Sequence, residues 1–549
     1  MSLMEITPSQ SRSRSKSRTR APGSSARSRS NSTSRRLHPR SLSNSSLNKL
    51  VITKKEIDGE RTSIPSVEAN LDNTLPLDFF KQDILAIAKT LKIHKWYKRQ
   101  LTIANLTVTR ISGALTNSIY KVEYQDESHT LPTLLLRVYG KNVDELIDRN
   151  RELETLVKLS QKRIGPRLLG IFTNGRFEQF LDGFNTLNKE NIRDEIISQM
   201  LGRRMKDLHF KIELDDKDLG DLPSCWILIE KWLKIFENDY LPGYSSTDKK
   251  DIFWVDFEKF KQVIGKYKSW LFDHYESESF SSNYKFCHND TQYGNLLLHE
   301  SFNKEDVIVD STPMSSTTTS VSSMEDAIKS SSNKKDSDLV VIDFEYSAAN
   351  FPAFDIVNHF SEWMSDYYHE EKPYYIFNEN YPTKNEQLNL IKAYVEYDFQ
   401  FPSSTLKTSK TTEDLINEPS ANLLNYEIEK LYNECIFWRA SVQIYWCLWG
   451  LIQNGPITPL VTNGKSEEQG IDATYSITTA TESLTIEDND QASESITSSD
   501  DEFSYLKYSN QKVALIMGDL IQFGLIDKKD IEEKYWNDIK YLDCAPFKL

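Results

Sequence analysis

Two short motifs constrain the fold of this chain more than any other feature of its sequence. The first is the segment 288–295, whose pattern H-x-D-x-x-x-x-N supplies Asp290 and Asn295. The second is the apolar run 339–342, which ends at Asp343. Short apolar runs are typical of buried strands, so each motif is expected to stand next to a strand. Both follow, in this order, a half of the chain that is rich in strand patterns.

The spacing inside the first motif is the one that phosphoryl transfer requires. In the catalytic loop of protein kinases an Asp accepts the proton of the attacking hydroxyl, and an Asn five residues later holds Mg²⁺. We therefore expect Asp290 to be the catalytic base and Asn295 a metal ligand. Asp343, at the end of its strand, is expected to hold Mg²⁺ as the D-F-G Asp does. The pattern predicts an enzyme that uses ATP and Mg²⁺.

Three segments have the composition of unstructured chain. Residues 1–72 contain Ser/Arg repeats, and the first 55 residues hold 13 Lys or Arg against one acidic residue. The segment 310–338 is rich in Ser and Thr, and it accounts for the 48 residues between Asn295 and Asp343, which exceed the protein-kinase spacing. The segment 461–502 holds 11 acidic residues against one Lys. Both internal segments exceed normal loop length, which favours disordered insertions in a folded domain.

The remaining sequence predicts an α+β fold with two lobes, like that of protein kinases. A β-rich N-terminal lobe is expected over 73–180 and a mainly helical C-terminal lobe over 181–549, with a short β section at 286–343. Asn174-Gly175 is a strong hairpin signal between two of the strands. The apolar patterns predict helices at 79–95 and 142–160, and strands at 106–111, 119–124, 134–139, 168–173 and 176–180.

The N-terminal lobe offers candidate phosphate-binding residues. Arg137 lies on the third predicted strand, where protein kinases place a phosphate-binding Lys, and Arg can grip phosphate with two hydrogen bonds. Glu152 lies on the following helix, in the place of the partner of that Lys. The turn that contains Ser112, Gly113 and Asn117 would let backbone N–H groups approach phosphates, although it does not match G-x-G-x-x-G. An exposed strand residue and a surface charge are the plain alternatives for Arg137 and Glu152.

Several longer segments are more specific than these single residues. These segments are Ile111-Ser112-Gly113, Leu135-Leu136-Arg137-Val138-Tyr139-Gly140, Ile164-Gly165-Pro166, Asn174-Gly175-Arg176-Phe177-Glu178-Gln179-Phe180, His288-Asn289-Asp290, Asp343-Phe344-Glu345-Tyr346-Ser347 and Phe354-Asp355-Ile356-Val357-Asn358-His359-Phe360-Ser361-Glu362-Trp363-Met364. With them the chain resembles the choline/ethanolamine kinase family over about residues 79–549, apart from the two insertions. Its Ser/Arg tail and insertions are most like those of fungal members.

The resemblance implies the fold of aminoglycoside phosphotransferases, with ATP bound between the lobes. It implies phosphorylation of choline to phosphocholine, the first step of the CDP-choline route to phosphatidylcholine. Asp290 would be the base and Asp343 a Mg²⁺ ligand, while Gln292 and Asn295 would position metal and phosphate. The remaining ATP contacts that it implies are Ser112, Gly113, Asn117, Arg137, Gln179 and Phe180. Ala114 stands where the family more often has a second Gly in the phosphate turn.

The resemblance also implies a pocket for the choline cation. A quaternary ammonium donates no hydrogen bond, so proteins hold it with aromatic faces and a nearby carboxylate. Trp446 and Trp449 lie three residues apart and therefore share one face of a helix. A Trp pair at this spacing is more often part of a core, so the assignment depends on the resemblance. The other pocket residues that it implies are Tyr346, Glu362, Tyr367 and Tyr508.

Three other functions stay open from the sequence. The first is an ethanolamine kinase, or an enzyme that accepts both alcohols; the Trp pair favours the methylated substrate. The second is a non-catalytic scaffold on a kinase fold, against which the intact Asp290, Asn295 and Asp343 argue. The third is an RNA-associated Ser/Arg protein. The whole chain has a formal net charge of −15, and because residues 1–55 carry +12, the remainder carries −27. Such an acidic body argues against nucleic-acid binding.

The sequence also predicts a cellular setting. Five cysteines without a C-x-x-C pair favour a reducing compartment, and we expect a cytoplasmic protein. The longest apolar stretch, 440–452, is shorter than a membrane span, so none is expected. Serines in the basic tail and at 498–499 are predicted targets of protein kinases, although an inert tail is the plain alternative. A homodimer is left open.

Overall fold

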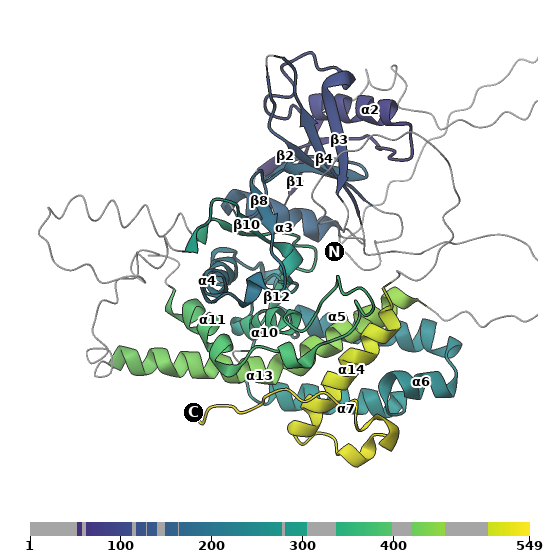
Figure 1. The fold of residues 1–549 in the computed structure, drawn as a ribbon, viewed down its shortest axis with the longest axis vertical. Helices are drawn as coiled ribbons and strands as arrows, with labels where there is room; N and C mark the ends of the chain where they lie inside the picture. The colour runs from purple at the N-terminus through teal and green to yellow at the C-terminus, as the bar shows by residue number, and fades with distance from the viewer. Residues whose placement is uncertain are drawn as a thin grey trace, which may run out of the picture.

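The computed structural model consists of two lobes, one above the other in Figure 1. It describes residues 52–57, 62–111, 117–127, 129–139, 149–162, 164–276, 280–304, 336–397, 419–455 and 503–549. The Ser/Arg repeats, the predicted phosphorylation sites, the segment 461–502 and most of 310–338 lie outside the described residues. So does the turn with Ser112 and Gly113, and so do the side chains of Asn117 and Glu152.

The N-terminal lobe is a seven-stranded sheet with the order β1-β2-β6-β7-β5-β4-β3. All neighbouring pairs are antiparallel except β2 and β6. Helix α2 packs on the sheet through Phe80, Ile84 and Ile87, which join Val122 and Leu136 in one buried cluster. The elements are β1 (Ile52–Ile57), β2 (Thr62–Val67), α2 (Leu77–Thr90), β3 (Leu106–Ile111), β4 (Asn117–Tyr124), β5 (Leu134–Tyr139), α3 (Arg149–Lys162), β6 (Leu168–Phe172) and β7 (Gly175–Gln179).

The folded lobe begins earlier than the sequence patterns predicted. Strands β1 and β2 lie inside the segment 1–72, which we expected to be unstructured. Ile64 and Val67 are buried, and β2 pairs in parallel with β6, about a hundred residues further along the chain. Two short polar strands give a weak local pattern, and the partner of β2 is too distant in sequence to reveal it.

Two other boundaries differ from the prediction. Helix α2 ends at Thr90 rather than at residue 95, because Lys92 and Lys95 adopt positive φ angles of 55° and 68°, which end a right-handed helix. At the end of the segment 310–338, Asp336 belongs to the fold. It accepts two hydrogen bonds of 2.8 Å from the Arg203 guanidinium.

The C-terminal lobe is mainly helical and carries two small sheets on the side of the N-terminal lobe (Figure 1). One sheet has the order β11-β10-β8, and the other pairs β9 with β12. The strands are β8 (Phe184–Thr186), β9 (Lys285–Cys287), β10 (Leu296–His299), β11 (Leu339–Val341) and β12 (Ala348–Asn350). The helices are α4 (Glu195–Lys211), α5 (Ser224–Ile235), α6 (Ser246–Phe253), α7 (Phe257–Phe272), α10 (Pro352–Glu362), α11 (Lys384–Glu396), α13 (Pro419–Asn454) and α14 (Tyr505–Gln522).

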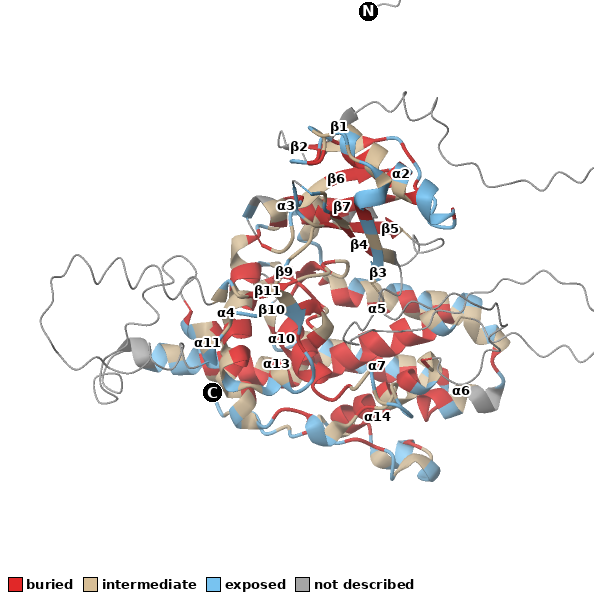
Figure 2. Cartoon of the chain, turned by 45° about the horizontal axis from the view of Figure 1, so that its top comes forward, coloured by how far each residue is buried: buried red, intermediate tan, exposed pale blue. Residues whose placement is uncertain are grey.

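Helix α13 is the central helix of the C-terminal lobe. It packs against α14, α10, α5 and α11, and its middle is buried (Figure 2). By length and composition its stretch Asn422–Asn454 could cross a membrane, but 94% of the apolar window is buried inside the fold, as in the core helix of a folded domain. The Arg439 guanidinium fixes α13 to α14 through Asp519, with Nε 3.0 Å from both carboxylate oxygens.

Candidate active site

The H-x-D-x-x-x-x-N segment forms a loop between β9 and β10. Asn289 has a φ angle of 65°, and the chain then turns through a short helix at Tyr293–Asn295. The side-chain nitrogen of Asn295 donates hydrogen bonds of 2.9 Å to both the backbone oxygen and Oδ2 of Asp290. The structure therefore brings the predicted base and the predicted metal ligand into direct contact.

A buried carboxylate on α10 holds this loop in place. Asp355 accepts hydrogen bonds from the backbone N–H groups of His288 (2.9 Å) and Asn289 (2.8 Å), and its Oδ2 lies 2.9 Å from Nε2 of His209. Burial opposes the charge of Asp355, but the hydrogen bond and charge of His209 and the contacts of His288 hold its pKa below the usual value. Asp355 is thus an ionised clamp on the loop backbone.

His209 and Asp355 also form, with Cys287, a cluster of metal-ligand types buried behind the loop. The carboxylate already bridges His209 and the loop, and Nδ1 of His209 lies 2.9 Å from the Tyr394 hydroxyl. The thiol of Cys287 donates to the backbone oxygen of Asn350 at 3.5 Å. Because each group has a protein partner, we interpret the cluster as support for the catalytic loop.

The second motif lies directly beside the first. The backbone N–H of Ile342 donates to the Asn295 oxygen at 2.9 Å, and Nε2 of His288 lies 2.9 Å from the Ile342 oxygen. Asp343 follows with a φ angle of 65° and remains partly exposed. Its Oδ1 lies 3.1 Å from Nη1 of Arg137, which comes from β5 in the other lobe. The two lobes therefore meet at Asp343.

Arg137 is buried among charged groups. Its Nε lies 3.6 Å from Oε1 of Glu178 on β7, and the same oxygen accepts a 2.5 Å hydrogen bond from Nε of Arg176. The sequence predicted Glu152 as the partner of Arg137, and that side chain lies outside the described residues. Strands β5 and β7 are neighbours in the sheet, so Glu178 reaches Arg137 across the ladder. Arg137 is therefore fixed at the boundary between the lobes.

Three carboxylates lie near Asp290 of the loop, and together with it they give the site a negative field. Burial raises the pKa of Asp290 well above its usual value, and the charges of Glu362, Asp343 and Glu345 raise it further, while the Asn295 hydrogen bond opposes the shift. A carboxylate with raised proton affinity is suited to accept a proton. The same field attracts cations, whether a metal ion or a cationic substrate.

The remaining predicted nucleotide residues lie around the connection between the lobes. Gln179 ends β7 and its Oε1 accepts a 2.9 Å hydrogen bond from Nε of Arg167. The ring of Phe180 lies under the Lys121 ammonium, 5.2 Å from Nζ. Gln292 caps the short helix of the catalytic loop, where its Oε1 accepts a 3.0 Å hydrogen bond from the Gly294 N–H.

The predicted pocket tryptophans form one wall of an aromatic cluster. The rings of Trp446 and Trp449 are 5.4 Å apart at 78°, and Tyr346 lies 5.5 Å from Trp446 at 70°. Nε1 of Trp449 donates to the Tyr346 hydroxyl at 3.0 Å, and Nε1 of Trp446 donates to Oδ1 of Asn358 at 2.7 Å. With both indole N–H groups bonded, the orientation of the rings is fixed.

The second wall carries the carboxylate. The Tyr367 hydroxyl donates to Oε2 of the buried Glu362 at 2.7 Å. Phe503 joins the two walls, since its ring lies 6.4 Å from Tyr367 and 5.5 Å from Tyr508, while Tyr508 lies 6.3 Å from Trp449. Burial raises the pKa of Glu362, while the charge of Lys512 and the Tyr367 hydrogen bond lower it.

The aromatic cluster is attached to the catalytic loop. Nδ2 of Asn289 donates to the backbone oxygen of Tyr346 at 3.0 Å. Tyr346 also lies only three residues after Asp343 in the chain. The site thus combines the carboxylate of Asp290, the side-chain oxygens of Asn295 and Asp343, and an aromatic cluster that contains the carboxylate of Glu362.

Comparison with protein families matches nearly the whole described chain. The model described as choline/ethanolamine kinase covers residues 108–517, and the one described as choline kinase N terminus covers residues 57–105. The chain belongs to the choline/ethanolamine kinase family. Choline kinase of Saccharomyces cerevisiae is 36% identical over 511 residues, which are 88% of this chain and 83% of that protein. Ethanolamine kinase of the same yeast is 31% identical over 537 residues, with 90% and 89% covered.

A solved structure has a fold similar to that of this chain. The choline kinase from Cryptosporidium parvum Iowa II has a TM-score of 0.51 to this chain at 19% sequence identity. The match covers 81% of this chain and 97% of that one. The predicted two-lobed class of fold is therefore confirmed.

For this choline/ethanolamine kinase, the sequence missed several residues of the site. Asp355 and Glu178 act through contacts that no local spacing reveals. Phe503 and Lys512 flank Tyr508 on the same segment, and the aromatic run around residue 505 was the available signal for Phe503. Lys512 gave no signal, because a lysine in a helix is normally exposed.

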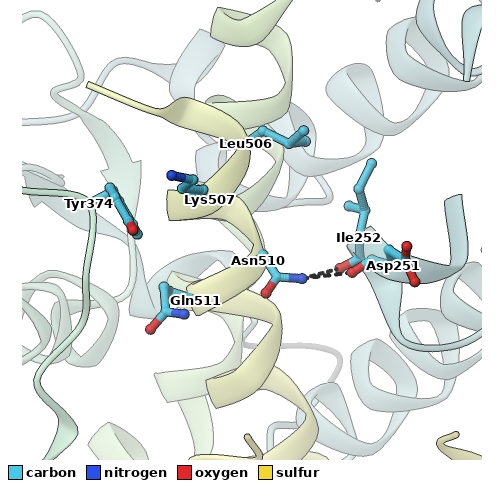
Figure 3. Close-up of a pocket in the computed structure, with 7 residues that line it drawn as sticks. All are labelled: Asp251, Ile252, Tyr374, Leu506, Lys507, Asn510 and Gln511. Carbon is cyan, nitrogen blue, oxygen red and sulfur yellow. Dashed lines mark hydrogen bonds between the residues drawn. The ribbon is translucent and has the colours of Figure 1, made fainter. Parts of the chain in front are cut away.

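A separate pocket of about 430 Å³ lies beside α14 (Figure 3). None of the predicted site residues lines it. Four of its residues lie on α14, and Nδ2 of Asn510 donates to the backbone oxygen of Asp251 at 2.8 Å. The pocket is lined by Asp251, Ile252, Tyr374, Leu506, Lys507, Asn510 and Gln511.

Proposed function

We propose that this kinase transfers the γ-phosphoryl group of ATP to the hydroxyl of choline. The observation that carries the proposal is the attachment of an aromatic, carboxylate-containing cluster to the H-x-D-x-x-x-x-N loop. The 3.0 Å hydrogen bond from Asn289 to the Tyr346 oxygen makes this link. A substrate whose cation rests among the rings would therefore bring its other end toward Asp290.

Choline suits the cluster because its quaternary ammonium needs no hydrogen-bond acceptor. Trp446, Trp449 and Tyr346 supply ring faces, which attract a cation through their quadrupoles. Glu362 supplies the opposite charge from a buried position, and Tyr367 and Tyr508 complete the surroundings. We assign choline binding to these six residues. Each ring is worth about 0.5–2 kcal/mol of binding free energy.

The loop supplies the proton chemistry. Asp290 orients the choline hydroxyl and accepts its proton as the phosphoryl group is transferred. Asn295 fixes the Asp290 carboxylate through its hydrogen bond to Oδ2. Asp355, which holds the backbone at 288 and 289, positions the base without touching the substrate.

The nucleotide end of the site fits a Mg²⁺-dependent reaction. Asp343 and Asn295 offer oxygen ligands of the kind that Mg²⁺ prefers. The ion pair of Asp343 with Arg137 indicates that this carboxylate is placed to face positive charge. When bound, Mg²⁺ neutralises charge on the transferred phosphate. We assign Arg137, Gln179, Phe180 and Gln292 to the nucleotide, and Ser112, Gly113, Asn117 and Glu152 stay predictions.

Ethanolamine is the second candidate substrate. The 31% identity with an ethanolamine kinase over nine tenths of this chain favours it, as does the carboxylate of Glu362, which can accept hydrogen bonds from a primary ammonium. The purified protein, assayed with each alcohol at saturating MgATP, distinguishes the two. We expect the larger kcat/KM for choline, and a clear preference for ethanolamine would contradict the assignment.

We also propose that the enzyme works in the cytoplasm. All five cysteines are unpaired thiols, four of them buried. Free buried thiols fit a reducing compartment. Fractionation of cells that express the tagged protein tests the proposal, and recovery in a secreted or lumenal fraction would contradict it.

A further inference from the structure

Lys512 is the least expected side chain of the aromatic cluster. It lies on α14 one turn after Tyr508, and it is completely buried. Its Nζ lies 5.1 Å from the centroid of the Tyr508 ring. Within the described part of the chain, no group accepts a hydrogen bond from its ammonium. A buried charge without such a partner is costly, so its position calls for a counter-charge.

The groups that face Lys512 come from three neighbouring elements. Glu362 on α10 attracts its positive charge, while burial raises the pKa of the Cys447 thiol on α13 to about 12 and keeps that group uncharged. Lys540, in the C-terminal segment, carries an ammonium that the Lys512 ammonium repels. Nζ of Lys540 donates a 2.6 Å hydrogen bond to Oε1 of Gln511. Tyr508 faces it from its own helix. Glu362 is the carboxylate among these groups, and it is also the one assigned to the substrate cation.

The charges of Glu362 and Lys512 each oppose the shift that burial causes in the pKa of the other. Burial lowers the pKa of Lys512 to about 8, although the charge of Glu362 raises it. Burial raises the pKa of Glu362, and the Lys512 charge lowers it. The aromatic cluster thus holds a buried acidic side chain, Glu362, and next to the ring of Tyr508 a buried basic one, Lys512. A bound cation that faces Glu362 adds a second positive charge to this part of the cluster.

We propose that Lys512 is the resident counter-charge of Glu362 and that it sets both the affinity of the pocket for cations and the pH dependence of that affinity. The proposal rests on the proposed choline site. A bound cation repels the ammonium of Lys512, so binding favours its neutral form and releases a proton to solvent. By linkage, the KM for choline falls as pH rises through about 8.

The test compares Lys512→Met with Lys512→Arg, which keeps the charge. KM and kcat for choline are measured between pH 6.5 and 9.5, with 3,3-dimethylbutan-1-ol, the uncharged isostere of choline, as a competing ligand. At pH 7.5 we expect Lys512→Met to lower the KM for choline by up to about fourfold, since a group with a pKa of about 8 is then protonated in about three quarters of the molecules. The step near pH 8 disappears in this variant. The kcat of Lys512→Met and the inhibition constant of the isostere for this variant should each change less than about twofold.

Lys512→Arg is expected to keep the KM of the unmodified enzyme at pH 7.5. A rise in the choline KM of Lys512→Met, or an equal change for choline and the isostere, would show a structural role and overturn the proposal. Calorimetry of choline binding to the unmodified enzyme near pH 8, in two buffers of different ionisation enthalpy, keeps the test independent of variant folding. We expect proton release, and binding without it would also overturn the proposal. Failure of the unmodified enzyme to phosphorylate choline would instead contradict the proposed function.

Discussion

Replacement of Asp355 by Asn should disable the catalytic loop although residue 355 touches no substrate. The carboxylate accepts three hydrogen bonds, with Oδ1 serving the Asn289 N–H and Oδ2 serving the His288 N–H and His209. An amide has one acceptor oxygen, so its NH₂ group must face at least one N–H donor. Removal of one partner from a buried charged network costs about 3–5 kcal/mol.

The loss should appear in both stability and rate. Because Asp290 is two residues from the clamped His288, a displaced backbone moves the base away from the hydroxyl. A misplacement of about 1 Å costs on the order of 100-fold in rate. We therefore expect Asp355→Asn to lower kcat for choline at least about 100-fold, with the KM for ATP little changed. Production of phosphocholine and denaturant unfolding are the two measurements.

The matched control is Asp519→Asn. Asp519 is equally buried and paired with Arg439, but it lies between α13 and α14 rather than on the catalytic loop. This variant should lose a similar amount of stability and keep its kcat when assayed below its unfolding transition. If both variants lost kcat equally, or if Asp355→Asn kept it, the positioning role of Asp355 would be refuted.

Other expected outcomes follow from the same contacts. Trp449→Ala should raise the KM for choline about tenfold and leave the KM for ATP unchanged. Trp449→Phe keeps a ring face and should keep most of the affinity for choline. Equal loss of affinity in both variants would argue against a cation–ring contact. Burial raises the pKa of Glu362, so kcat/KM for choline should be full at high pH and fall as pH drops through a value above the usual carboxyl range. Glu362→Gln should remove the contribution of Glu362 to this acid limb in a pH–rate profile and leave that of Asp290, whose pKa is also raised. The pKa of Asp355 is lowered in the folded protein. Its contribution to stability should therefore be present above the unfolded-state pKa, near 4, and be lost as pH falls through the folded-state pKa. Unfolding curves measured from pH 7 to 3 would detect this loss.

Local patterns in the sequence predicted the parts of the site that depend on local geometry. Asp290 and Asn295 are five residues apart on one loop, and Trp446 and Trp449 share one helix face, so spacing alone brings each pair together. The strands of the N-terminal sheet, apart from β1 and β2, were readable for the same reason. Several of them are short runs rich in apolar residues, such as Leu134–Tyr139 in β5 and Leu168–Phe172 in β6.

The sequence could not reveal contacts that depend on distant segments. Asp355 lies more than 60 residues from the loop that it holds, and on α10 it is surrounded by apolar neighbours, as any core position would be. Glu178 reaches Arg137 only because β7 pairs with β5 in the sheet. Lys512 is buried only because α14 packs against α13 and places it behind the pocket. Such roles follow from tertiary packing, not from residue type or spacing.

The most direct test of the account is the Asp290→Asn variant, assayed for choline phosphorylation at saturating MgATP. The Asn side chain preserves size and can keep a contact with Asn295, but it cannot accept the hydroxyl proton. We predict that kcat falls by about 10²–10⁴, while the protein stays folded and still binds choline and ATP. A variant that phosphorylated choline at a rate close to that of the unmodified enzyme would contradict the assignment of Asp290 as the base.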